Sequence, residues 1–134
     1  MNKLTGNIIT VTSNQYMSLI DVKVGDDIFT ATLLETPETA SYLAVGNRVS
    51  LMFKETEVSL AKHLTGELSL RNRITVTIQK IERGDILSAI TLDYYTNTLV
   101  SVVTTRAVDR LQLNAGDQVE ALIKANEVVL SHDL

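Results

Sequence analysis

The sequence contains no cysteine, no tryptophan and only one proline among its 134 residues. Without cysteine, disulfides and thiolate metal sites are excluded. The chain also has no excess of basic residues, since its formal net charge is −4 at pH 7. A general nucleic-acid binder usually presents a basic face. Aromatic residues make up 4% of the chain, which argues against a surface on which bases stack.

Segments that would direct the chain to a membrane are lacking as well. No apolar run is long enough to span a bilayer, and the opening MNKLTGNI has no apolar signal-peptide core. We therefore expect a cytoplasmic protein. His63 and His132 are isolated, so no direct metal-cation ligands are predicted. The carboxylates show no catalytic pairing, and phosphate-loop and dinucleotide motifs are missing, so we expect a protein that is not an enzyme.

What the sequence does contain is a repeat at an offset of 70 residues. Residues 2–60 align without a gap on residues 72–130, with 12 identities over 59 positions, where roughly four would arise by chance from average residue usage. The repeat predicts two copies of one small domain, a first copy over residues 1–64 and a second over residues 65–134. Domains this small bury a modest fraction of their surface, so we expect them to pack against each other or against other chains.

Alternating apolar and polar residues predict strands in both copies. In the second copy, residues 73–81 have the period of two that is typical of a half-buried strand. A short helix is predicted over residues 106–112, capped by Thr104 or Thr105, and a corresponding helix begins at Thr36-Pro37-Glu38. The predicted fold class is all-β, with two tandem five-stranded barrels of the oligonucleotide/oligosaccharide-binding (OB) type, each with one short helix. The remaining strands are expected near residues 3–12, 16–23, 28–34, 48–54, 57–60, 86–92, 98–103, 118–124 and 128–130.

Two segments of the second copy resemble a known family. It opens on Ser69-Leu70-Arg71-Asn72 and ends on Gly116-Asp117-Gln118-Val119 and Ile123-Lys124-Ala125. These segments resemble the Mop domain, the molybdate-binding member of the transport-associated OB (TOBE) group. That family opens on Ser-Ala-Arg-Asn and ends on Gly-Asp-x-Val followed by Ile-Lys-Ala. Two fused copies resemble the molbindins, cytoplasmic molybdenum-storage proteins, and also the effector half of the molybdate-responsive repressor.

The resemblance implies a site for molybdate or tungstate, which are tetrahedral dianions bound between neighbouring barrels. Such a site needs charge-assisted hydrogen bonds, each contributing roughly 1.5–3 kcal/mol. Thr104 also lies where a helix begins, and free N–H groups there favour an anion. The family's serine three residues later is Ala107 here, which removes one donor. The implied oxyanion ligands are the hydroxyls of Ser69 and Thr104, the cations Arg71 (through its side chain or its backbone N–H) and Lys124, and the backbone N–H of Ala125; Asn72 and Lys54 are further candidates.

The first copy departs from this pattern. Met1 stands where Arg71 stands, Leu34 replaces Thr104, and Glu55 replaces Ala125. Because a carboxylate repels a bound dianion, we expect no equivalent site in the first copy. Lys54 and Asn2 match their counterparts. Both copies have asparagine at this position, as Asn2 and Asn72, whereas only the second copy has the implied ligands. A role in hydrogen bonding to the backbone at the start of the strand is therefore the better interpretation for both asparagines.

The leading functional hypothesis is cytoplasmic molybdate storage and homeostasis, with tungstate as a second ligand of the same charge and shape. The alternative is the ligand-sensing domain of a molybdate-dependent transcriptional regulator, for which an upstream helix-turn-helix domain would be diagnostic. We expect a homo-oligomer, with a trimer favoured by the molbindin resemblance and a dimer by the regulator. Neither membrane association nor direct nucleic-acid binding by this chain is expected.

Overall fold

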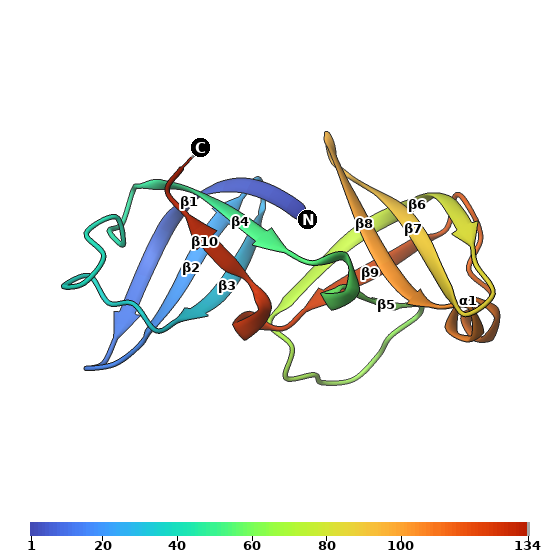
Figure 1. Cartoon of the computed structure of the whole chain (residues 1–134), viewed down its shortest axis with the longest axis horizontal. Coiled ribbons are helices and arrows are strands. Elements are labelled where there is room, and N and C mark those ends of the chain that lie inside the picture. Colours follow the sequence, from blue (N-terminus) through green and yellow to red (C-terminus); the bar gives the residue numbers. More distant parts are fainter. Residues whose placement is uncertain (134) are drawn as a thin grey trace. The chain divides into compact units, whose positions relative to one another are not determined.

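The computed structural model describes residues 1–133 and is built almost entirely of antiparallel strands (Figure 1). The described residues also form one α-helix, α1 (Thr105–Leu111), and two single-turn 3₁₀ helices, η1 (Glu55–Glu57) and η2 (Ala125–Glu127). The strands are β1 (Asn2–Ser13), β2 (Ser18–Val24), β3 (Asp27–Leu33), β4 (Arg48–Phe53), β5 (Ser59–Ala61), β6 (Asn72–Arg83), β7 (Leu87–Tyr94), β8 (Asn97–Thr104), β9 (Gln118–Ile123) and β10 (Val129–Ser131).

Alternating burial along the strands builds the two cores. In β2 every second residue is buried, as expected for a strand with one face on the core. Ile20 and Val22 of β2 are fully buried, and Phe29 stacks on Phe53 with ring centroids 6.5 Å apart. Ile90 of β7 is likewise fully buried, in the core of the other sheet. The predicted all-β class and its strands are therefore confirmed, with ends that differ by a few residues.

The two sheets exchange their last strands. Their orders are β10-β4-β1-β2-β3 and β5-β9-β6-β7-β8. Strand β10 of the second copy pairs with β4 of the first, with Leu130 opposite Leu51. Conversely, β5 of the first copy pairs with β9 of the second, with Leu60 opposite Ala121. Each copy therefore supplies the closing strand of the other copy's sheet.

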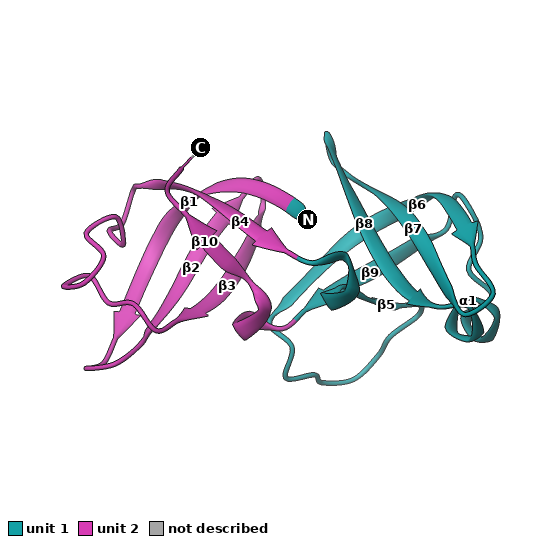
Figure 2. Ribbon diagram, viewed as in Figure 1, with its two compact units in different colours: residues 1–2, 54–123 teal, residues 3–53, 124–134 magenta. Residues whose placement is uncertain are grey.

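This exchange determines the two compact units, which differ from the division at residue 64. Unit 1 contains residues 1–2 and 54–123, and unit 2 contains residues 3–53 and 124–134 (Figure 2). In unit 1 the sheet curls so that β5 contacts β8, and η1 packs on β8. In unit 2 β10 contacts β3, and η2 packs on β3. Each unit is thus an OB-like barrel whose closing segment comes from the other copy.

The second copy contains the predicted helix. Thr104 caps α1 by accepting a hydrogen bond from the N–H of Ala107. Thr105 is buried and donates its hydroxyl to the carbonyl of Gly84 at 2.7 Å, while Ser88 donates to Thr105 at 2.8 Å. Val108 is also buried. These contacts fix α1 to the β6–β7 hairpin.

The prediction of a helix in the first copy is wrong, because residues 37–39 form a turn instead. The carbonyl of Thr36 accepts from the N–H groups of Thr39 and Ala40, and the Thr39 hydroxyl bonds Thr36 as well. The position equivalent to Val108 is Glu38. Without an apolar residue there to bury, a helix gains little from packing and one turn suffices.

Asn2 acts as a substitute strand partner within unit 1. The residue is buried, with 5% of its surface exposed. The amide Nδ2 donates to the carbonyl of Val100 at 2.8 Å, and Oδ1 accepts from the N–H of Val100 at 2.8 Å. Both backbone groups of Val100 at the edge of β8 are thereby satisfied. This confirms the backbone-bonding interpretation for Asn2.

Replacing Asn2 by alanine should lower the free energy of unfolding by about 1–3 kcal/mol, because it leaves both polar groups of Val100 without their partner. Urea titration followed by circular dichroism measures the change. Asn126→Ala is the control, since Asn126 is exposed and its loss should alter stability by no more than about 0.5 kcal/mol. Equal effects of the two substitutions would contradict the role of Asn2.

Candidate oxyanion site

The predicted ligands are divided between the two units. Ser69, Arg71 and Thr104 belong to unit 1, whereas Lys124 and Ala125 belong to unit 2. Ala125 is half-buried and the other four are exposed. Their side chains are therefore accessible to an anion from solvent.

The register of β6 and β9 brings two of the predicted cations to one end of a sheet. Arg71 precedes Asn72, the first residue of β6, and Lys124 follows Ile123, the last residue of β9. Asn72 and Ile123 are opposite each other in the β6–β9 pair, and such partners have Cα atoms about 5 Å apart. Arg71 and Lys124 are thus each the neighbour in the chain of one member of the same cross-strand pair. Folding pairs Asn72 with Ile123 within unit 1, although these residues are far apart in the sequence.

A neighbouring arginine is neutralised. Arg73 makes a bidentate ion pair with Glu120, through Nε to Oε2 and through Nη2 to Oε1 at 2.9 Å. The hydrogen bond from Arg73 holds the pKa of the Glu120 carboxyl below its usual range. Within residues 1–133, by contrast, neither Arg71 nor Lys124 has an ion-pair partner. Their positive charges remain available to a ligand.

Thr104 lies at the other end of unit 1. It ends β8, whose residue Val103 pairs with Ser88, and Ser88 pairs with Arg83 at the end of β6. A 12-residue strand such as β6 is roughly 35–40 Å long when extended. Figure 1 shows α1, which follows Thr104, at the opposite end of this unit from the start of β6. The structure therefore does not bring Thr104 and Arg71 of one chain together.

A cavity of about 340 Å³ adjoins Thr104, and it is lined by Asp85, Ile86, Thr104 and Arg106. The N–H of Thr105 donates to the carbonyl of Ile86 at 2.8 Å. Since the Ala107 N–H is held by Thr104, two backbone donors at the start of α1 are already used. The Thr104 O–H and the Arg106 guanidinium are the side-chain donors that line the cavity. Arg106 is not among the ligands that the resemblance implies.

Unit 1 contains another cavity, of about 380 Å³, which is lined by Met1, Lys54, Glu55 and Thr56 of the first copy and by Val102 of the second. The N-terminal ammonium of Met1 lies 2.7 Å from Oε1 of Glu55. Hydrogen bonds from this ammonium and from the backbone N–H of Glu55 itself hold the pKa of the Glu55 carboxyl below its usual range. A negative charge is thereby fixed in the cavity.

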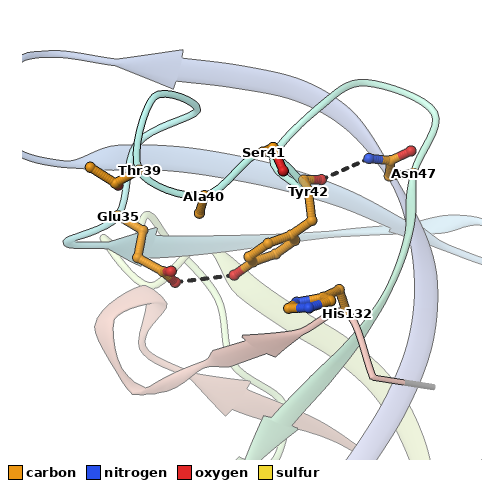
Figure 3. Close-up of a pocket in the computed structure, with 7 residues that line it drawn as sticks. All are labelled: Glu35, Thr39, Ala40, Ser41, Tyr42, Asn47 and His132. Atoms are coloured by element: carbon orange, nitrogen blue, oxygen red, sulfur yellow. Dashed lines mark hydrogen bonds between the residues drawn. The ribbon is translucent and has the colours of Figure 1, made fainter.

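Figure 3 shows a further cavity, of about 500 Å³, in unit 2. The rings of Tyr42 and His132 stack with centroids 4.6 Å apart, and the Tyr42 hydroxyl donates to Oε1 of Glu35 at 3.1 Å. Burial and the Glu35 carboxylate raise the pKa of Tyr42 to about 12. None of the predicted oxyanion ligands lines this cavity, and its carboxylate disfavours a dianion.

His132 instead anchors the residues that follow β10. Its counterpart 70 positions earlier is Lys62, which follows β5 in unit 1. The Lys62 ammonium donates to the carbonyl of Gln112 at 2.8 Å and lies 3.3 Å from Oδ2 of Asp117. Both exchanged strands are thus fastened just beyond their ends, one by an aromatic stack and one by an ammonium.

Other kinds of site find no support in the part of the chain that the structure describes. Across residues 1–133, no group of three or more His, Asp or Glu side chains is placed to hold a metal ion. In the same residues, no helix has the length and apolar character needed to cross a membrane.

Two OB-like barrels with exchanged closing strands define a class of tandem OB-type β proteins. The family model of the TOBE domain matches residues 68–130. The crystal structure of the cytoplasmic molybdate-binding protein ModG with molybdate bound is similar over 97% of this chain and 94% of that chain, with a TM-score of 0.90 and 30% identity. The chain belongs to the TOBE domain family, as a protein with two consecutive Mop-type domains.

Two curated relatives are named as molybdenum import and transport proteins, and both are longer than this chain. The molybdenum import ATP-binding protein ModC of Brucella abortus is 41% identical over 81 residues, 60% of this chain and 23% of that protein. The molybdenum transport protein ModE of Herbaspirillum seropedicae is 26% identical over 133 residues, 97% of this chain and 49% of that protein. The chain thus spans about a quarter of the first relative and about half of the second.

Proposed function

We propose that this chain binds molybdate reversibly and without catalysis, and that it serves as a cytoplasmic store that buffers the anion. The observation that supports the proposal is the pairing of Asn72 with Ile123, since Arg71 precedes the first of these residues in the chain and Lys124 follows the second. The similarity of nearly the whole chain to the molybdate-bound ModG structure supports the choice of anion. Tungstate, with the same charge and shape, is expected to bind as well.

The proposed ligands suit a tetrahedral dianion. Arg71 and Lys124 together carry the two positive charges that compensate it, and charge-assisted hydrogen bonds are the strong ones. Ser69 adds a hydroxyl, and the backbone N–H of Ala125 adds a donor without a bulky side chain. Binding by hydrogen bonds alone leaves the anion chemically unchanged, as a storage protein requires.

Thr104 completes the site from another copy of the chain in this proposal. The register puts Thr104 and Arg71 at opposite ends of unit 1. One anion can therefore contact both residues only when they belong to different chains of an oligomer. The protein is therefore proposed to be a homo-oligomer, with a trimer favoured. Anion binding then stabilises assembly, and assembly in turn raises anion affinity.

Mixed oligomers test this arrangement. Arg71→Ala and Thr104→Ala chains should each lose molybdate affinity, whereas oligomers refolded from an equal mixture should regain about a quarter of the wild-type sites, because random pairing joins intact surfaces at that frequency. Titration calorimetry counts the sites, and native mass spectrometry reports the number of chains and anions. Wild-type protein without molybdate binding would contradict the proposed function. Absence of recovery in the mixture would contradict the shared site alone.

A ligand-sensing role in a transcriptional regulator is the second candidate. It rests on the resemblance to the effector half of the molybdate-responsive repressor, and this chain spans 49% of the molybdenum transport protein ModE. The distinguishing experiment is to express the complete native reading frame and measure whether it binds operator DNA in a molybdate-dependent manner. A helix-turn-helix segment ahead of residue 1, together with such binding, would decide for the regulator.

A further inference from the structure

The cavity at the start of α1 contains a cation that is not among the proposed ligands. Asp85, Ile86, Thr104 and Arg106 line it, and Thr104 is the residue proposed to contact an anion held by another chain. We propose that the Arg106 guanidinium donates to the same molybdate ion as Thr104 and supplies the donor that is missing at Ala107. This inference rests on the proposed function and adds a residue to its site.

The backbone beside this cavity is held in place. Thr105, the residue before Arg106, is buried, and its hydroxyl donates to the carbonyl of Gly84 at 2.7 Å. The N–H of Thr105 donates to the carbonyl of Ile86 at 2.8 Å, so the start of α1 is fixed against the β6–β7 connection. The Arg106 side chain therefore begins at a fixed point beside Thr104, and only its own rotamers have to be ordered when it binds a ligand.

The Arg106 guanidinium is available to an anion. It is exposed, and among the described residues it has no ion-pair partner. Arg83 at the same end of unit 1 instead donates to Oδ1 of Asp109 at 2.8 Å, and this hydrogen bond holds the pKa of the Asp109 carboxyl below its usual range. A planar guanidinium donates two parallel N–H groups to two oxygens of one anion. Arg106 therefore suits a tetrahedral oxyanion.

Asp85 in the same cavity balances the charge of the enlarged site. Arg71 and Lys124 of one chain and Arg106 of another would bring three positive charges to the anion. The Asp85 carboxylate lines the same cavity as Arg106 and reduces the total to two, which equals the charge of molybdate. This carboxylate therefore offsets an extra cation, in contrast to Glu35, whose cavity no lysine or arginine lines.

The first copy lacks both donors. Thr104 corresponds to Leu34, and Arg106 corresponds to Thr36, which is buried. A cavity of unit 2 includes Thr36 and the equivalent of Asp85, and it is lined by Ser13, Asn14, Gln15, Thr36, Pro37 and Glu38. That lining has a carboxylate and no basic side chain. The hydroxyl and the guanidinium therefore occur together only in the copy that also has the other proposed ligands.

Titration calorimetry with molybdate tests the role of Arg106. Arg106→Ala should lower the affinity by about tenfold or more, as expected for the loss of a charge-assisted hydrogen bond. Arg106→Lys keeps the charge but loses the paired N–H groups, so its loss should be smaller. Arg110→Ala is the matched control and should keep the wild-type affinity, because Arg110 is an exposed residue of the same helix that does not line the cavity. Unchanged affinity in Arg106→Ala, or an equal loss in Arg110→Ala, would overturn the inference.

Mixed oligomers show to which surface Arg106 belongs. Refolding an equal mixture of Arg106→Ala and Arg71→Ala chains should restore about a quarter of the wild-type sites, because each variant supplies the surface that the other lacks. An equal mixture of Arg106→Ala and Thr104→Ala chains should restore none, since both substitutions alter the same surface. Recovery in the second mixture, or none in the first, would contradict the placement of Arg106 beside Thr104 at a shared site.

The outcomes separate this inference from the proposed function. Wild-type protein that binds no molybdate would refute the function, and the inference with it. Wild-type protein that binds molybdate, and loses affinity in Lys124→Ala but not in Arg106→Ala, would support the function and refute the inference alone.

Discussion

Replacing Lys124 by alanine should lower the affinity for molybdate by tenfold or more, which corresponds to the loss of about 1.4 kcal/mol or more. Lys124 directly follows Ile123, the strand partner of Asn72, and its ammonium has no ion-pair partner within residues 1–133. Its removal leaves a dianion with one cation instead of two. Titration calorimetry at fixed ionic strength measures the change.

Lys54→Ala is the matched control, because Lys54 has the same residue type at the equivalent position of the first copy. Its cavity already contains the Glu55 carboxylate, so molybdate affinity should change by less than about twofold. Similar losses in the two variants would show that overall charge, and not a site at Lys124, governs binding.

Replacing Leu130 by alanine should destabilise unit 2 by about 2–4 kcal/mol, although this residue belongs to the second copy in sequence. Leu130 is 7% exposed and lies opposite Leu51 in the β10–β4 pair. Loss of its side chain leaves a void against the core of unit 2. Hydrogen exchange followed residue by residue should therefore accelerate first in β4.

Leu60→Ala is the reciprocal variant. Leu60 lies opposite Ala121 in the β5–β9 pair, so hydrogen exchange should accelerate in β9 of unit 1 and not in β4. The two variants together distinguish exchanged strands from strands that stay with their own copy. Acceleration of β9 by Leu130→Ala would contradict the observed topology.

Strands could be predicted from the sequence because their signal is local. Alternation over residues 73–81 indicates one buried face wherever the strand pairs, and the structure extends this strand to Asn72–Arg83. The helix of the second copy was also predictable, since Thr104 supplies a cap and Val108 an apolar anchor. In the first copy, Pro37 suggested a helix start, but Glu38 at the anchor position leaves only a turn.

The strand exchange could not be predicted from the same patterns. Alternation shows that Leu130 is buried, yet an identical pattern would bury it against either sheet. The choice is made by long-range pairing with Leu51, for which the sequence carries no local signal. For the same reason, the motif resemblance named Thr104 and Arg71 together without revealing that they lie at opposite ends of one unit.

Only one partner of the ion pair between Met1 and Glu55 could be predicted from the sequence. Glu55 in place of Ala125 predicted a charge unfavourable to a dianion. The partner of that charge, the Met1 ammonium, is a backbone group that no motif contains. Only the fold shows that the terminus and the carboxylate meet.

The exchanged closing strands have a consequence for the ancestry of the chain. One copy alone would leave the edge of its fourth strand open, and the segment able to close it would be the last strand of a second molecule. Such a single-copy ancestor would be a reciprocally swapped dimer whose folding depends on protein concentration. Joining two copies into one polypeptide turns that encounter into an intramolecular one at high effective concentration. The fused gene can then diverge in its two halves, which a dimer of identical chains cannot do.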